Sequence, residues 1–139
     1  MIASAQTSNS KLAQTNNKLT VQSQNFADDS CAIRSLDWDR SRFDIEFGLR
    51  NGTTYNSFII KGQKLAIIDT SHAKFEKLWF EELMKKVNPL EVDYLITSHT
   101  EPDHSGLIGN LLELNPNIIV VGSKSVSYTH LTLPTNREV

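Results

Sequence analysis

The sequence has a single cysteine, Cys31, among its 139 residues. One thiol cannot form a disulfide within the chain, so a disulfide-stapled scaffold is excluded and a reducing compartment is indicated. A zinc–thiolate site or an Fe–S cluster is disfavoured for the same reason, since each needs several cysteines. We expect Cys31 to be an ordinary, partly buried residue. Any metal site in this chain should therefore use nitrogen and oxygen ligands.

Long hydrophobic runs and an excess of one charge are also missing. The longest apolar run, around Ile118–Val121, has the length of a strand, whereas a transmembrane helix needs about 20 residues. The formal net charge is −2, so no general electrostatic attraction to nucleic acid or an anionic membrane is expected. Hydrophobic residues make up 39% and charged residues 22%, values typical of a globular domain. We therefore predict a cytoplasmic protein with no membrane span and no nucleic-acid partner.

Residues 1–30 have few apolar and few charged side chains and are rich in Ser, Thr, Asn and Gln. Such a segment buries too little apolar surface to offset the entropy lost on ordering, which predicts a disordered polar tail. It has no apolar region of the kind found in secretory signals. Its serine content and lack of early acidic residues leave a plastid location as the alternative, although the segment contains no arginine.

Hydrophobic periodicity predicts an ordered α/β domain over residues 31–126. Apolar residues at three- and four-residue steps predict helices over about His72–Val87 and Gly106–Leu114. Hairpins followed by alternating strands and helices favour a layered sandwich. Residues 127–139 have no clear period and are predicted to be irregular. Alternating or β-branched segments predict six strands: Ala32–Trp38, Arg42–Phe47, Thr53–Ile60, Lys64–Asp69, Val92–Thr97 and Ile118–Gly122.

The segment Thr97–Gly106, T-S-H-T-E-P-D-H-S-G, places four ligand-type side chains directly after a hydrophobic strand. In an extended chain alternate side chains share a face, so His99, Glu101 and Asp103 can converge on one side. His104 can join them only if the chain turns there. Two nitrogen donors and two carboxylates suit a borderline or hard cation with open positions. The pattern predicts a metal site rather than a solvated polar turn.

The H-x-E-x-D-H string resembles the metal loop of the metallo-β-lactamase superfamily, whose hydrolytic members mostly carry H-x-H-x-D-H and bind zinc. Glu101 stands in place of the second histidine, and this substitution resembles the flavodiiron proteins. The upstream segments Ile33–Leu49, Gly52–Asn56 and Leu65–Thr70 are similar to the start of flavodiiron proteins, above all the diflavin type of oxygenic phototrophs. The resemblance covers about Ala32–Val126. It implies an α/β fold, the metallo-β-lactamase-like αββα sandwich, with only its N-terminal part present.

The resemblance also implies roles for the loop residues. His99 and Glu101 would bind one iron ion and Asp103 the other, with no catalytic residue separate from the ligands. His104 matches a position that binds the second iron in some members and swings away in others. Asp69 resembles the superfamily's early aspartate, which would brace the loop, a strand-end cap being the alternative. The implied cofactors are two non-haem iron ions, with FMN and a second flavin in the full-length protein.

Two histidines lie outside this loop. His72 is at a predicted helix start, where we expect a surface residue. His130 lies in the irregular C-terminal segment and is rejected as a ligand, because the family's remaining metal histidines and bridging aspartate come much further downstream.

The function implied by the resemblance is an oxidoreductase that reduces dioxygen to water with electrons from NAD(P)H passed through flavin. Nitric oxide is the oxidant in some members, and the phototroph type would relieve excess electrons from photosynthesis. The full-length protein would be a head-to-tail homo- or hetero-oligomer. Two alternatives stay open. One is a zinc-dependent hydrolase, against which Glu101 argues. The other is an inactive fragment, because residues 127–139 look foreign or frameshifted and the flavin domains are absent.

Overall fold

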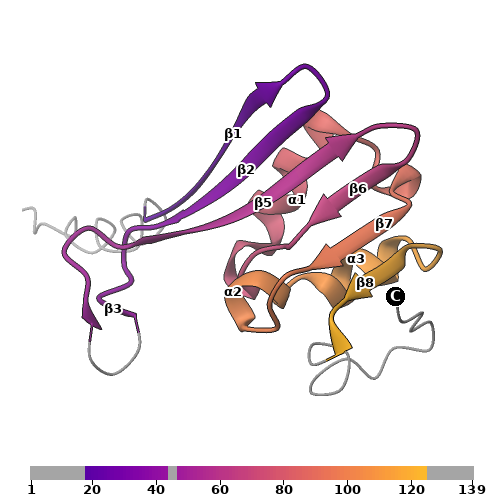
Figure 1. Cartoon of the computed structure of the whole chain (residues 1–139). Coiled ribbons are helices and arrows are strands. Elements are labelled where there is room, and N and C mark those ends of the chain that lie inside the picture. Colours follow the sequence, from indigo (N-terminus) through magenta and orange to yellow (C-terminus); the bar gives the residue numbers. More distant parts are fainter. Residues whose placement is uncertain (1–17, 44–46, 125–139) are drawn as a thin grey trace, which may run out of the picture.

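The computed structural model describes residues 18–43 and 47–124 and contains a six-stranded mixed sheet (Figure 1). The strand order is β1-β2-β5-β6-β7-β8. Neighbours from β1 to β6 are antiparallel, whereas β6, β7 and β8 are parallel to one another. The strands are β1 (Leu19–Ala27), β2 (Ser30–Asp37), β5 (Thr53–Lys61), β6 (Leu65–Ile68), β7 (Tyr94–Thr97) and β8 (Ile119–Gly122). The predicted α/β class is confirmed.

The helices connect the last three strands, and in Figure 1 α1 and α3 lie behind the sheet while α2 lies at its edge, where β7 ends. A 3-10 turn, η1 (Ala73–Phe75), leads into α1 (Glu76–Lys86), and a second turn, η2 (Pro89–Glu91), leads into β7. Asn88 accepts a hydrogen bond from the backbone N–H of Leu90, which caps η2. Between β7 and β8 the chain forms α2 (Pro102–Ser105) and α3 (Ile108–Leu114). Among the described residues no helix is long and apolar enough to cross a bilayer.

The hydrophobic core lies between the helices and one face of the sheet. Trp79 and Leu83 of α1 and Leu111 of α3 are fully buried there. The indole N–H of Trp79 donates to the hydroxyl of Ser57 over 2.8 Å, so the polar group of this large side chain is also satisfied. The strands contribute alternate residues to the same core, namely Ile33, Tyr55, Ile59, Ile67, Leu95 and Val120.

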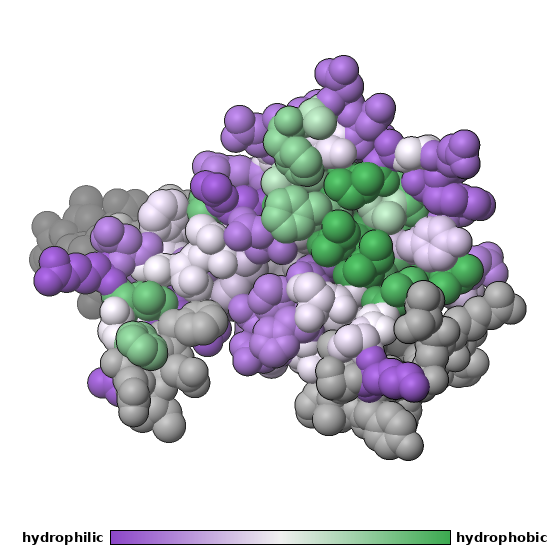
Figure 2. Space-filling model, in the orientation of Figure 1, coloured by the Kyte–Doolittle hydropathy of each residue, from purple (hydrophilic) through white to green (hydrophobic). Residues whose placement is uncertain are grey.

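The opposite face of the sheet, here called the open face, is apolar but only half-buried. Strand pairing aligns its side chains in two rows across β5, β6, β7 and β8. Figure 2 shows the resulting hydrophobic patch facing the viewer, with hydrophilic residues around it. The main sheet therefore has described helices on one side only, which corresponds to half of an αββα sandwich. The rows are Phe58, Ile68, Ile96 and Val121, and Ile60, Ala66, Tyr94 and Ile119.

Two neighbouring residues of β7 allow the two faces to be compared. Leu95 is 0% exposed in the core, whereas Ile96 is half-buried on the open face. We expect Leu95→Ala to lower the free energy of unfolding by about 3 kcal/mol, because a fully buried leucine leaves a cavity. Ile96→Ala should lower it by about 1 kcal/mol, since folding removes less of the apolar surface of Ile96 than of Leu95 from contact with water. Urea unfolding of both variants measures the difference, and equal losses would contradict a one-sided core.

Several sequence predictions need correction. The predicted disordered tail of residues 1–30 is wrong over Leu19–Ala27, which forms β1 along the edge of the sheet. Its apolar residues are too few for an independent element, but β2 supplies a partner for its backbone. Residues 1–17 and 125–139, which include the predicted irregular segment and His130, lie outside the described residues. Cys31 is 4% exposed, deeper than expected, and burial raises the pKa of its thiol.

The strand predicted over Arg42–Phe47 lies partly outside the described residues, at positions 44–46, and its described ends do not form one strand of the main sheet. The chain there forms β3 (Arg42–Phe43) and β4 (Phe47–Gly48), which pair with each other in a separate two-stranded ribbon. Phe47 is 66% exposed, because the ribbon projects away from the main sheet and its side chains do not pack on that sheet (Figure 1). The chain bends just before β5, and Gly52 there has a positive φ of 74°, a conformation that glycine adopts readily.

Candidate metal centre

The predicted metal loop begins where β7 ends and turns into the short helix α2. Pro102 occupies its first turn, where proline is favoured because the backbone N–H is not needed. The hydroxyl of Ser105 donates to the carbonyls of Thr100 and Glu101, which closes the turn. The alternation expected for an extended loop therefore stops at Glu101, and Asp103 and His104 reach the site from a helix instead.

The four predicted ligands stand as two histidine–carboxylate pairs. His99 Nε2 lies 3.0 Å from Glu101 Oε1, and both side chains are more than half exposed. His104 Nε2 lies 3.6 Å from Asp103 Oδ2, and this pair is more buried. The rings of His99 and His104 are adjacent, with centroids 5.5 Å apart. The turn in α2 thus brings His104 beside the residues that sequence spacing alone would separate from it.

Asp69, at the end of β6, holds this loop from beneath. Its carboxylate is nearly buried and accepts hydrogen bonds from the backbone N–H of Ser98 over 2.8 Å and from the Ser98 hydroxyl. It also lies 3.0 Å from His104 Nδ1. With the Nδ1 proton shared with Asp69, His104 presents Nε2 to the side where Asp103 lies. These contacts favour a role for Asp69 in bracing the loop over the alternative, in which it only caps the end of the strand.

The backbone at Asp69 is in an uncommon conformation, with a positive φ of 56°. A residue with a β-carbon adopts this left-handed region at a cost, and aspartate tolerates it better than most because its short polar side chain can bond locally. The conformation is maintained by the hydrogen bonds of its carboxylate and by Asp69 N–H donating to Ile96 O over 2.8 Å. Strained residues held in this way often occur at functional sites.

A second set of contacts fastens the loop to the chain that follows β6. The N–H and hydroxyl of Thr70 both donate to the carbonyl of His104, over 2.7 and 2.8 Å. The same hydroxyl accepts from the N–H of Leu107 over 3.2 Å. Gly106 lies so close to the carbonyl of Ser71 and the N–H of Ala73 that no β-carbon would fit. The φ of Gly106, −61°, is ordinary for any residue, so the glycine is required here for its lack of a side chain and not for backbone freedom.

The donor atoms of the four predicted ligands suit a metal ion, but their positions in this structure meet its needs only in part. Imidazole nitrogens and carboxylates are suitable ligands for iron or zinc. Glu101 adds a hard oxygen donor, which favours iron. Within the described ranges, however, no three histidine, cysteine or carboxylate side chains converge on one point. The loop therefore provides two oriented pairs, and a complete coordination shell would need the side chains to move or further ligands to join.

Sequence reasoning missed a polar cluster behind this loop. Buried Tyr55 of β5 donates to Asp37 over 2.7 Å and contacts Arg40 and the ring of His72. Burial and the Asp37 carboxylate raise the pKa of Tyr55 to about 12. Burial alone would raise the pKa of Asp37, but the hydrogen bonds from Lys74 and Tyr55 lower it overall. His72 was expected on the surface, and it is half-buried instead. The only sequence signal for this cluster was the alternation in β5.

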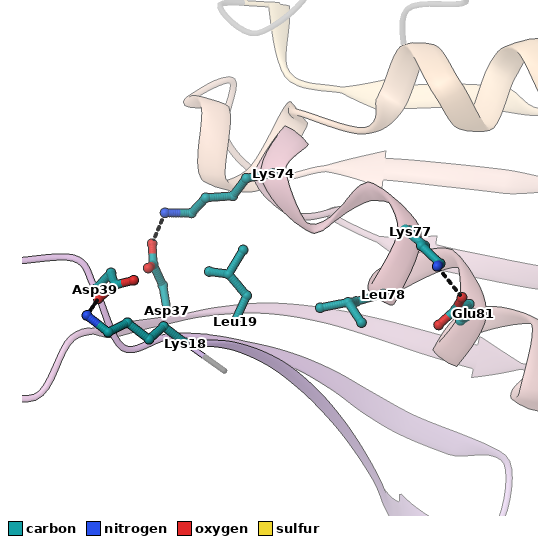
Figure 3. A pocket seen from close by; sticks show the side chains of 8 residues that line it. All are labelled: Lys18, Leu19, Asp37, Asp39, Lys74, Lys77, Leu78 and Glu81. Carbon is teal, nitrogen blue, oxygen red and sulfur yellow. Dashed lines mark ion pairs between the residues drawn. The ribbon is translucent and has the colours of Figure 1, made fainter. Parts of the chain in front are cut away.

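A groove opens on the same side of the molecule, between the start of β1, the end of β2 and helix α1 (Figure 3). Its charged side chains form oppositely charged pairs, with Lys18 bonded to Asp39, Lys74 to Asp37, and Lys77 facing Glu81 across one helical turn. Its apolar lining comes from Leu19 and Leu78. None of the predicted ligands lines the groove, so it is separate from the candidate metal site. Its paired charges neutralise one another.

No protein-family model matches the chain. Individual proteins do. A diflavin flavoprotein of Nostoc sp. strain PCC 7120 is 64% identical over 107 residues, which is 77% of this chain and 19% of that protein. Diflavin flavoprotein A 1 of Synechocystis sp. strain PCC 6803 is 56% identical over the same shares. The chain thus spans about a fifth of the length of these curated relatives.

Solved structures give the same result. The flavodiiron core of Flv1 from Synechocystis sp. PCC6803 is 28% identical, with a TM-score of 0.73 over 86% of this chain and 31% of that one. A Thermotoga maritima flavoprotein has a TM-score of 0.79 over 87% of this chain and 32% of that one, and at 22% identity it supports the fold alone. The sequence matches, the fold and the H-x-E-x-D-H loop lead to one conclusion: the chain belongs to the flavodiiron family, among its diflavin flavoproteins, and carries the N-terminal part of their metallo-β-lactamase-like fold.

Proposed function

We propose that this chain supplies the first ligands of a non-haem diiron centre at which the whole protein reduces dioxygen to water. The observation that carries the proposal is the orientation of His104 by Asp69, which directs a second histidine toward Asp103 beside the His99–Glu101 pair. A histidine whose other ring nitrogen meets a carboxylate is the usual arrangement of a metal ligand. This arrangement has little purpose in a solvated surface turn.

In this proposal His99 and Glu101 hold one iron ion, and Asp103 and His104 hold the other. The iron ions would supply the binding and the reduction of dioxygen. The chain's own contribution is to fix the ligands. Asp69 holds the ring of His104 and Thr70 holds its backbone carbonyl. This histidine would therefore lose little further freedom when it binds a metal ion. The more exposed His99 and Glu101 are free to adjust.

The remaining features of the proposal come from the family. FMN and a second flavin would carry electrons from NAD(P)H or another donor, and two copies of the full-length protein would meet head to tail. The name of the Synechocystis relative includes the word diflavin, which supports two flavins. A cytoplasmic location, with the plastid as the alternative, stays a prediction.

Zinc-dependent hydrolysis is the competing function of this fold, and metal content separates the two. A version of the protein extended to the length of its relatives, purified from cells supplied with both metals, is expected to hold about two iron ions per chain, as in dinuclear sites. Element analysis measures this ratio, together with oxygen consumption in the presence of a reduced flavin donor. Stoichiometric zinc with ester or amide hydrolysis would contradict the oxidase.

The metal loop can also be tested in the chain as given. We expect it to bind Co²⁺, a spectroscopic substitute for iron, weakly and through the loop, because half-built sites bind metal poorly. Replacing His99 and Glu101 together by alanine should weaken binding at least tenfold, as measured by titration of the Co²⁺ absorption bands. Glu113→Gln, an exposed change on α3, serves as the control and should have no effect. Unchanged binding in the double variant would remove the loop from the proposal.

A further inference from the structure

The Tyr55 cluster, formed by Tyr55, Asp37 and Arg40, contacts His72 next to the segment that fastens the metal loop. Tyr55 is 3% exposed, and its hydroxyl donates to Asp37 Oδ2 over 2.7 Å and accepts from Arg40 over 3.1 Å. Lys74 pairs with the same Asp37 oxygen across the groove shown in Figure 3. Phe75 contacts the tyrosine ring edge-on, with centroids 5.8 Å apart. These contacts fix the ring of Tyr55 on several sides.

His72 is the connection between this cluster and the metal loop. Its ring stacks on Tyr55 with centroids 6.1 Å apart and an angle of 28° between the planes. Its Nδ1 accepts from the N–H of Lys74 over 3.3 Å, so one ring nitrogen faces the start of η1. Burial, followed by the nearby Lys74 and Arg40 charges, lowers the pKa of His72. A neutral imidazole can stack on the phenol ring without losing the hydration of a charge.

The segment between Asp69 and His72 carries the contacts that seat the loop. Thr70 bonds the His104 carbonyl, and Ser71 presents its carbonyl to Gly106 at a distance that excludes a β-carbon. The hydroxyl of Ser71 also donates to Ser35 over 2.8 Å inside the core. A shift of His72 would therefore move Thr70 and Ser71, and with them the backbone of His104.

We infer that His72, stacked on Tyr55, is a positioning residue for the candidate metal loop. It acts through Thr70 and Ser71 on the backbone of His104, and it is neither a ligand nor an ordinary surface histidine. The inference rests on the proposed function, because it concerns the same metal loop. Its stacking partner, Tyr55, is in turn fixed by Asp37 and Arg40.

The test uses Co²⁺ titration of the chain as given, with the absorption spectrum of the bound ion as a second readout. His72→Ala removes the stacked ring and is expected to weaken binding about fivefold and to change the spectrum, because residues outside the ligand set commonly have effects of this order or larger. His72→Phe restores a ring on Tyr55 but cannot bind a metal, and it should recover affinity to within about twofold. His72→Asn can still cap η1 but cannot stack, and it should behave like the alanine variant.

Two hydroxyl deletions complete the experiment. Tyr55→Phe keeps the ring and removes the hydroxyl that bonds Asp37 and Arg40, and about a threefold loss of affinity is expected, because the change acts on the loop only through His72. Tyr94→Phe is the matched control, because Tyr94 lies on the open face and its hydroxyl bonds to none of the described residues. Urea unfolding of each variant verifies that binding is measured on folded protein.

The outcomes separate the inference from the proposed function. If the parent chain binds Co²⁺ and the His99, Glu101 double variant does not, the metal loop stands whatever His72 does. Failure of His72→Phe to recover binding would show that a ring stacked on Tyr55 is not sufficient to position the loop, and it would overturn the inference. Parent-like binding and spectrum in His72→Ala would overturn it as well. A role in stability alone would move the urea midpoint of the His72 variants but leave the affinity and spectrum of the folded protein unchanged.

Discussion

Gly106→Ala is expected to lower the free energy of unfolding by about 3 kcal/mol, at the upper end of overpacking effects. An alanine β-carbon would lie 2.5 Å from the Pro102 carbonyl oxygen, 2.7 Å from that of Ser71 and 2.8 Å from the Ala73 nitrogen. All three are backbone atoms of α2 and of the segment after β6, so no side chain can rotate away. The strain would separate the metal loop from its support. Urea unfolding measures the loss, and Co²⁺ titration should show weaker binding in the same variant.

Gly109→Ala provides the control for this experiment. Gly109 lies three residues further on, inside α3, and nothing beyond its chain neighbours and its own helix backbone lies within 4 Å of the position of an added β-carbon. The same substitution there should stabilise the chain by about 0.5–1 kcal/mol, because alanine favours a helix interior more than glycine does. Two destabilised variants would mean that any added methyl group harms this region. Two neutral variants would mean that the close approach at Gly106 relaxes without cost.

Asp69 carries the second large prediction, in which stability and metal binding should separate. Asp69→Ala leaves the Ser98 N–H and the His104 ring without their acceptor and places alanine at a φ of 56°. We expect it to cost about 3 kcal/mol, since buried polar groups lose a charged partner and the backbone strain remains. Asp69→Asn keeps an oxygen for the Ser98 N–H and tolerates the positive φ, so it should cost only about 1 kcal/mol.

For metal binding the asparagine variant is the informative one. An amide cannot hold the Nδ1–H of His104 as a carboxylate does, so a loss of Co²⁺ affinity of about 10- to 100-fold is expected. Asp93→Asn is the matched control. Asp93 also accepts a backbone N–H over 2.8 Å, from Leu65 at the other end of β6, and should affect stability without affecting the metal. Parent-like affinity in Asp69→Asn would show that His104 does not need this partner.

Much of the fold could be predicted from local pattern because its core strands and helices bury regular faces. The apolar steps in α1 and the run in β7 follow the periods of helix and strand, and both were located within a few residues. β1 could not be predicted, because a polar edge strand is stabilised by backbone pairing with β2 rather than by its own side chains. The ribbon at Arg42–Gly48 could not be predicted either, because its described strands pair with each other and not with the main sheet.

The same division applies to the candidate site. The four ligand-type residues of the loop are visible in the sequence because the chemistry is concentrated within one short segment. The proposal of iron over zinc rests on Glu101, because a hard oxygen donor replaces a nitrogen donor. The residues that support the loop come from distant parts of the chain, from Asp37 to Thr70, and their hydrogen bonds depend on how the strands are ordered in the sheet.

The sequence by itself determined the α/β class, the order of the core elements and the identity of the candidate ligands, since each follows from residue type and spacing along one stretch of chain. Only the tertiary structure decided that His104 turns toward Asp103, that Asp69 holds its ring and that His72 packs on Tyr55. It also decided that the described helices cover only one face of the sheet. These features depend on which strands become neighbours, and strand pairing brings together residues that no local pattern links.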